Sequence, residues 1–274
     1  MNKLIDIIVI QETIDIDIQK NIDKFFNAIS KIKVKNTTIA VLHELSYLKY
    51  IAINKNKKNK LFAIKDNSVI IDKFCDLAKS KNIYILFPFY EVFRSKYYNT
   101  SILISSSGKI IAKYRKRNIP NETCYEEDYY FNKLKNEFPV VTINGFNIGL
   151  MICWDQWYSN SYIKLSKKNV DLILCPTSIG YAYCNSINIS MSEEKTKWRN
   201  TIVANSLMIN TPIVVVNRIG NEACRNKKIN FWGSSFVTNG NGDITYLAGN
   251  KRTLHRHTID LSTKRKYQKL WGFN

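Results

Sequence analysis

The stretch Phe146–Cys153 reads FNIGLMIC, an almost uninterrupted apolar run that decides the fold class. It follows Asn144-Gly145, a dipeptide typical of the tight turn between two strands, and so predicts a hairpin with the strand Val140–Ile143. The Ser and Asn residues within 159–168 are typical of residues that cap a helix. A buried strand followed closely by a helix indicates an α/β fold, with Cys153 at the exit of the strand.

Apolar strands and amphipathic helices alternate along much of the remaining chain. Helical spacing of apolar residues begins at Ile18, at Ile70 and within residues 195–209. Further strands are expected at residues 4–10, 38–42, 83–89, 102–105, 110–114, 172–175 and 213–217. Only 5 Pro and 10 Gly occur in 274 residues, and no Ser/Gly-rich linker interrupts the pattern. The sequence therefore predicts one layered α/β domain spanning residues 1–274.

Three chemically active side chains are expected where predicted strands end. Glu44 follows the strand at 38–42, Lys116 follows the strand at 110–114, and Cys153 ends the stretch quoted above. Taken singly, each has a structural interpretation, as a salt-bridge partner, a surface cation or a buried inert thiol. A nearby ammonium or helix N-terminus would lower the thiol pKa and favour the nucleophilic thiolate. Together the three residues indicate a thiol active site.

The loops around these residues resemble those of the nitrilase superfamily of carbon–nitrogen hydrolases, and within it the N-carbamoylputrescine amidases. The most specific match is ICWDQW at 152–157, in which Gln156 and Trp157 replace the arginine common in the superfamily. Further matches are PFYE at 88–91, CYEEDYYF at 124–131, PTSIG at 176–180, VVVNRIG at 214–220 and FWGSSFV at 231–237. The resemblance implies a single-domain αββα sandwich that works without a cofactor.

The resemblance also implies the roles of the three residues. Cys153 would be the nucleophile, Glu44 the general base, and Lys116 the cation that stabilises the tetrahedral intermediate. With the backbone N–H of Trp154, Lys116 would form an oxyanion hole, and one such donor is typically worth ~3–4 kcal/mol of barrier. Attack on an amide or ureido carbonyl would expel ammonia and leave a thioester for water to resolve.

A second active-site glutamate and several pocket residues complete the expected site. The register of the family pattern places this glutamate at Glu127 in preference to Glu126, where it would orient Lys116 and the substrate amide. Substrate contacts are expected from Trp154, Tyr50, Tyr125 and Glu194.

The first candidate substrate is N-carbamoylputrescine, which would yield putrescine, CO2 and ammonia. The missing arginine after Cys153 favours a substrate without a carboxylate, because guanidinium is the natural partner of that group. Ala182 stands where the resemblance places a glutamate that would pair with the distal ammonium of the substrate. The missing ion pair would cost ~2–5 kcal/mol of binding free energy, which Glu193 or Glu194 could offset. An amidase with another substrate and a catalytically silent oligomeric scaffold remain the alternatives.

Composition bears on whether the protein binds nucleic acid, metal ions or membranes. The net charge is +19, but the lysines are scattered among Asn and Ile without a recognition motif, so nucleic-acid binding is not expected. Six cysteines lack C-x-x-C spacing and only three histidines occur, so no metal site is expected. The first predicted strand is too short for a membrane span and contains Asp6. Reduced thiols and a cytoplasmic, homodimeric or larger homo-oligomeric enzyme with a small-molecule substrate are expected.

Overall fold

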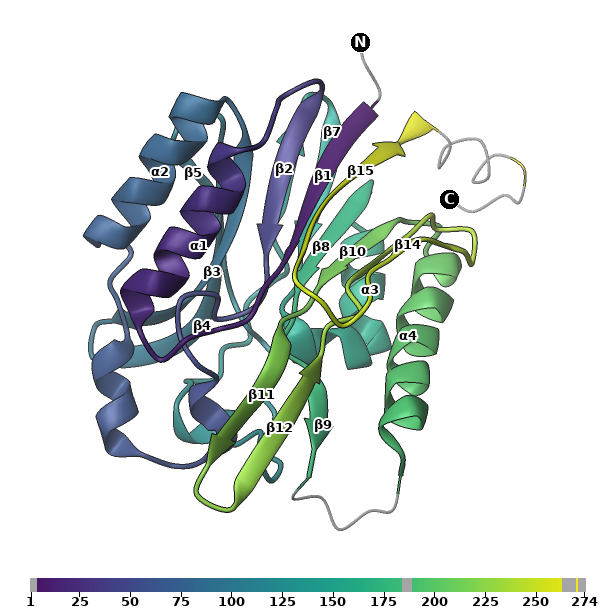
Figure 1. Cartoon of the computed structure of the whole chain (residues 1–274). Coiled ribbons are helices and arrows are strands. Elements are labelled where there is room, and N and C mark those ends of the chain that lie inside the picture. Colours follow the sequence, from purple (N-terminus) through teal and green to yellow (C-terminus); the bar gives the residue numbers. More distant parts are fainter. Residues whose placement is uncertain (1–3, 184–188, 263–269, 271–274) are drawn as a thin grey trace.

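The computed structural model describes residues 4–183, 189–262 and 270, and these form four layers in the order helix, sheet, sheet, helix (Figure 1). Helices α1 (Ile18–Ser30) and α2 (Val69–Lys81) cover the outer face of one six-stranded sheet. Helices α3 (Ser159–Ser166) and α4 (Met191–Met208) cover the outer face of the other. The predicted αββα sandwich is therefore confirmed.

The first sheet has the strand order β15-β1-β2-β3-β4-β5. Its strands are β1 (Leu4–Gln11), β2 (Thr37–Leu42), β3 (Tyr84–Phe93), β4 (Lys96–Ile104), β5 (Ile110–Arg115) and β15 (Thr253–Asp260). The central β1, β2 and β3 are parallel, and the outer strands pair antiparallel. Parallel strands buried on both faces read as continuous apolar runs, which is why residues 4–10 and 38–42 were recognisable in the sequence.

The second sheet has the strand order β14-β13-β10-β8-β7-β6. Its strands are β6 (Val140–Ile143), β7 (Phe146–Leu150), β8 (Leu172–Pro176), β10 (Ile213–Val216), β13 (Phe236–Thr238) and β14 (Ile244–Leu247). Three more strands form a small separate sheet, namely β9 (Gly180–Ala182), β11 (Ile219–Cys224) and β12 (Lys227–Trp232). The parallel β7, β8 and β10 end on one edge of the second sheet, where open α/β sheets place their ligands.

The FNIGLMIC stretch forms the predicted hairpin, but its strand is shorter than the apolar run. β7 ends at Leu150, and Cys153 opens the short 3₁₀ helix η4 (Cys153–Trp157). The chain leaves the sheet because the backbone N–H of Ile152 donates to Asp155 Oδ2 at 3.0 Å. The expected capping of the next helix is also wrong, since Tyr158 occupies the N-cap of α3 without a side-chain hydrogen bond.

Two further features bear on the expected environment of the protein. Cys124 is disulfide-bonded, so the expectation of reduced thiols throughout is wrong for this residue, because pairing depends on spatial proximity and not on spacing in the chain. Cys75, Cys153, Cys175 and Cys224 are free, and Cys184 lies outside the described residues. Within the described ranges, every helix is too short or too polar to span a bilayer.

The main apolar core lies between the two sheets and joins strands from both to α3 and α4. Leu174 on β8 is fully buried in this core, whereas Leu247 on β14 is 46% exposed. We expect Leu174→Ala to lower the free energy of unfolding by about 2–5 kcal/mol through lost burial and a residual cavity. Leu247→Ala is the matched control and should change it by less than about 1 kcal/mol. Urea unfolding followed by circular dichroism measures both, and equal losses would contradict this assignment of the core.

Candidate active site

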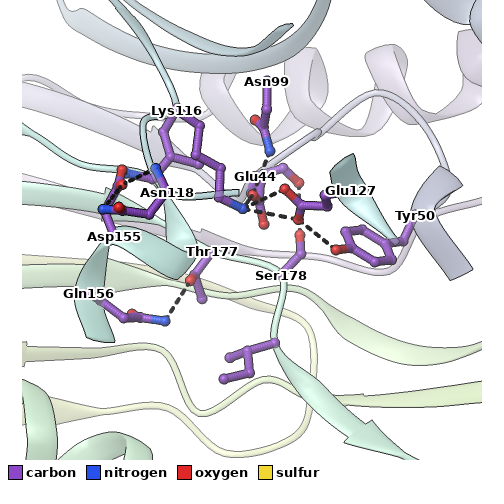
Figure 2. A network of polar contacts seen from close by, with 12 residues as sticks. Glu44, Tyr50, Asn99, Lys116, Asn118, Glu127, Asp155, Gln156, Thr177 and Ser178 are labelled. Atoms are coloured by element: carbon purple, nitrogen blue, oxygen red, sulfur yellow. Dashed lines mark hydrogen bonds and ion pairs between the residues drawn. The ribbon is translucent and has the colours of Figure 1, made fainter. Parts of the chain in front are cut away.

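Two loops bring Glu44 and Lys116 to the edge where the sheets face each other. Glu44 follows β2, and its backbone N–H donates to the carbonyl of Thr177 at 3.3 Å, just beyond β8 of the other sheet. Lys116 follows β5, and its backbone N–H donates to the carbonyl of Asn99 on β4 at 2.8 Å. The backbone of each residue is thus fixed by neighbouring strands, so both side chains point to one place (Figure 2).

A buried ion triad links Lys116 to two carboxylates (Figure 2). Lys116 Nζ donates to Glu44 Oε1 at 2.9 Å and to the two carboxylate oxygens of Glu127 at 2.8 and 3.0 Å. Glu127 begins the 3₁₀ helix η3 (Glu127–Tyr129). Asn99 Nδ2 donates to Glu44 Oε1 at 2.7 Å, and the Tyr50 hydroxyl donates to Glu127 Oε1 at 2.6 Å. All three charged side chains are completely shielded from solvent.

The triad sets the protonation of its members. Burial alone would lower the pKa of Lys116, but Glu127 and Glu44 hold that pKa well above its ordinary value, so the ammonium stays charged. Burial raises the pKa of Glu127 to about 7, against the opposing effect of Lys116. Glu127 therefore changes charge close to neutral pH.

Cys153 is 5% exposed and lies beside this triad. Burial and the negative charge of Glu44 raise the pKa of its thiol, and Lys116 only partly opposes them. The expectation of a lowered thiol pKa is wrong, because desolvation and two carboxylates outweigh one ammonium. The thiol rests protonated and needs a base. Glu44 Oε2 has no hydrogen-bond partner among the described residues, which leaves it able to take a proton.

The backbone of Cys153 is itself constrained. Its φ of +42° lies in the left-handed region, which costs free energy for a residue with a side chain. Asp155 holds the turn, since its carboxylate accepts from Ile152 N at 3.0 Å and from the Tyr114 hydroxyl at 2.8 Å. It also accepts from the backbone and side chain of Asn118 at 3.0 and 2.8 Å. One carboxylate thus ties the turn of Cys153 to the loop of Lys116 (Figure 2).

A second buried residue, Arg218, fixes the loop of Glu44. Its guanidinium donates to the carbonyls of Glu44 and Leu45 at 2.8 and 3.1 Å and to Ser178 Oγ at 2.9 Å. It also pairs with Glu222 at 2.9 Å, whose other oxygen accepts from the backbone N–H of Tyr50 at 2.7 Å. Arg218, directly and through Glu222, therefore fixes both ends of the single loop between β2 and residue 51, which carries Glu44 and Tyr50.

A cavity of about 490 Å³ opens onto Cys153 and Glu127. Aromatic side chains, among them Tyr125 and Trp154, form much of its wall, and Glu194 lies on the rim contributed by α4. The Tyr125 hydroxyl donates to the carbonyl of Gly180 at 2.7 Å and so anchors the start of β9. The size and the mixed lining suit a small metabolite with an apolar middle and polar ends.

The structure brings together most, but not all, of the residues expected from the sequence. Glu44, Lys116, Cys153 and Glu127 come together beside the cavity, which Cys153 and Glu127 line directly, whereas Glu126 pairs with Lys227. Trp154, Tyr125 and Glu194 line the cavity. Tyr50 is absent from the described lining and reaches the site through Glu127.

Four residues of the site were missed by the sequence analysis: Asn99, Asp155, Arg218 and Lys197. Asp155 and Arg218 could have been recognised in the sequence, because each is a charged residue within an otherwise apolar or small-residue segment, where a charge is expected to be buried and paired. Lys197 could not be recognised in this way, since it lies on a polar helix. Within the described ranges no cluster of three or more His, Cys, Asp or Glu side chains could hold a metal ion.

The buried ammonium gives a direct test of the triad. Lys116→Met would leave Glu44 and Glu127 buried without their cation, so we expect a loss of about 3–5 kcal/mol in the free energy of unfolding at pH 8. The loss should shrink at pH 6, where Glu127 takes up a proton and no longer needs a partner. Lys109→Met, at an exposed position, is the control. Equal stability of the two variants at both pH values would contradict the geometry.

Curated relatives match nearly the whole chain. A citrullinase of Francisella tularensis is 28% identical over 270 residues, covering 98% of this chain and 93% of the relative. An N-carbamoylputrescine amidase of Solanum lycopersicum is 26% identical over 256 residues, covering 91% of this chain and 84% of the relative. Both names describe enzymes that act on a ureido group.

Solved structures and a family model agree with these relatives. A carbon-nitrogen hydrolase from Helicobacter pylori superposes with a TM-score of 0.91 at 25% identity, covering 98% of this chain and 94% of the other. Nit3 of Saccharomyces cerevisiae, a nitrilase-superfamily member, shares the fold with a TM-score of 0.83 at 16% identity. The carbon-nitrogen hydrolase model matches residues 8–269. With a buried Glu–Lys–Cys constellation beside its cavity, the chain belongs to the carbon-nitrogen hydrolase family, whose amidase-type members cleave C–N bonds.

Proposed function

We propose that this chain hydrolyses the terminal ureido group of a carbamoylated amine, with Cys153 as the nucleophile. The observation that carries the proposal is the position of the thiol, which lines the cavity beside a buried ammonium and two carboxylates. The curated relatives that act on ureido groups support the substrate class.

The first step is attack of the Cys153 sulfur on the ureido carbonyl carbon. Glu44 accepts the thiol proton on its free Oε2 as the C–S bond forms. Negative charge then develops on the carbonyl oxygen, where the Lys116 ammonium and the backbone N–H of Trp154 are proposed to receive it. Collapse of the tetrahedral intermediate breaks the bond to the terminal nitrogen, and Glu44 returns its proton so that ammonia leaves.

Water completes the cycle at the thioester-like carbamoyl enzyme. Glu44 takes a proton from the water as it attacks the carbonyl carbon, and the same oxyanion site stabilises the second intermediate. The C–S bond breaks, the thiol regains its proton, and the released carbamic acid loses CO2 to give the free amine. Glu127 holds Lys116 in place by its two hydrogen bonds throughout.

Two substrates carry the required group on a chain of the same length. N-carbamoylputrescine is the candidate favoured by the sequence, and citrulline differs from it only by a carboxylate on the carbon that bears the ammonium. Ala182, in β9, is buried and uncharged, so it cannot pair with the distal ammonium of N-carbamoylputrescine. Both compounds therefore enter the test.

Ammonia release is the direct measurement. We expect the native chain to release ammonia from N-carbamoylputrescine or citrulline, and Cys153→Ala to abolish it, because no other group can form the covalent intermediate. Cys224→Ala removes a half-buried thiol outside the cavity lining and should leave the rate unchanged. Mass spectrometry of rapidly quenched enzyme should show an N-substituted carbamoyl adduct on Cys153, with a mass gain equal to the substrate less ammonia. Undiminished release by Cys153→Ala would refute the mechanism.

The pH profile tests the part played by Glu127. Its pKa is raised to about 7, so the carboxylate is ionised above that pH and protonated below it. We expect kcat/KM to fall about tenfold per pH unit on the acid side of neutrality, because protonated Glu127 no longer holds the ammonium. Tyr50→Phe removes a hydrogen bond that favours the ionised form, so the acid limb should move to higher pH.

Tyr125→Phe is the matched control for this profile. Its hydroxyl bonds to Gly180 and not to Glu127, so the acid limb should stay where it is in the native enzyme. An acid limb that is the same in Tyr50→Phe as in the native chain would rule out Glu127 as its source.

A further inference from the structure

The rim of the active-site cavity carries two opposite charges on one helix face. Glu194 and Lys197 both line the cavity that contains Cys153, and they lie three residues apart on α4, where side chains share a face. Glu194 is half-buried and Lys197 is exposed. Neither forms an ion pair within 4.0 Å among the described residues. Lys197 acts on Glu194 only electrostatically, so no salt bridge holds either charge away from a ligand.

No other charged residues in the described lining of the cavity form a comparable pair of opposite charges. Glu127 is occupied by Lys116 at the floor, and Glu122 is an exposed carboxylate on the rim. Lys197 is the only lysine or arginine among the described lining residues. Gln156, in the segment where the superfamily commonly has an arginine, is fully buried and donates to Thr177 at 3.3 Å, away from the cavity. A carboxylate entering the cavity has Lys197 as its cationic partner.

Part of the cavity wall is apolar and aromatic. Trp154, Trp157, Trp232 and Ile179 all line the cavity that contains Cys153. Such a surface suits the methylene chain that separates a ureido group from a charged end.

We infer that Glu194 and Lys197 select the distal end of the substrate and that this end is a zwitterion, the ammonium and carboxylate of a ureido α-amino acid. The inference rests on the proposed ureido hydrolysis and names its substrate class. Glu194 pairs with the α-ammonium and Lys197 with the α-carboxylate. A purely cationic end satisfies Glu194 but is repelled by Lys197, and a neutral end leaves both charges without a partner.

Four ureido compounds with the same alkyl chain separate the two charges. Citrulline carries both, N-carbamoylputrescine lacks the carboxylate, 5-ureidopentanoate lacks the ammonium, and butylurea lacks both. Steady-state ammonia release gives kcat and KM for each compound with the native enzyme, Lys197→Met and Glu194→Gln. Lys195→Met, on the same helix but not among the described lining residues, is the control for Lys197→Met.

We expect the native enzyme to have its highest kcat/KM with citrulline. Lys197→Met should raise KM about tenfold for citrulline and 5-ureidopentanoate, with kcat much less affected, and should leave butylurea unchanged. The same substitution should not weaken N-carbamoylputrescine, because it removes a repulsion. Glu194→Gln should raise KM for the two compounds that carry an ammonium. Lys195→Met should behave as the native enzyme.

Other outcomes would overturn the inference in distinguishable ways. If the native enzyme hydrolyses these compounds but Lys197→Met changes all four equally or none, the charge pair does not select the substrate, and the proposed function stands. A native preference for N-carbamoylputrescine over citrulline would also overturn the zwitterion assignment alone. Absence of ammonia release from all four would remove the proposed function and the inference together.

Discussion

The buried ammonium of Lys116 is the interaction on which the rest of the site depends. A cation without solvent contact is tolerated only when carboxylates and further hydrogen bonds replace its water, and here Glu44 and Glu127 do so. Asn99 and Tyr50 donate second hydrogen bonds to Glu44 Oε1 and Glu127 Oε1, the oxygens that Lys116 also contacts. These five residues come from four separate segments of the first half of the chain, since Glu44 and Tyr50 share one loop. The polar network can be satisfied only when those segments are packed correctly.

The same network explains why the nucleophile rests as a thiol. Burial disfavours a thiolate at Cys153, and with Glu127 ionised the two carboxylates and one ammonium add a net negative charge that disfavours it further until a carbonyl oxygen can take the charge. Preorganised donors then act on charge that exists only during the reaction, which lowers the barrier without stabilising the resting state. The left-handed backbone of Cys153 belongs to this arrangement, because Asp155 holds it in a conformation that the chain would otherwise leave.

Much of the fold was predictable because its signals are local. The hairpin at Asn144-Gly145 and the buried strands follow from turn chemistry and apolar runs, and both are present in the structure. The positions of Glu44, Lys116 and Cys153 followed from strand ends and family resemblance. The thiol pKa could not be predicted, since burial and the balance of nearby charges arise only after folding. The tie between Asp155 and Asn118 was equally invisible, because it joins loops that are 37 residues apart.

The division between floor and rim explains how one chemical mechanism can accept different substrates. The floor is built by backbone anchored in two sheets, and every charged group there is already paired. The rim includes one face of α4, on which Glu194 and Lys197 form no ion pair within 4.0 Å among the described residues. Substitution at Glu194 or Lys197 therefore changes the electrostatic potential at the cavity mouth without breaking a buried ion pair. The net charge of +19 does not determine the electrostatic potential at the cavity mouth. Salt screens the effect of a surface lysine beyond about 10 Å, whereas groups that line the cavity act on a ligand at contact distance.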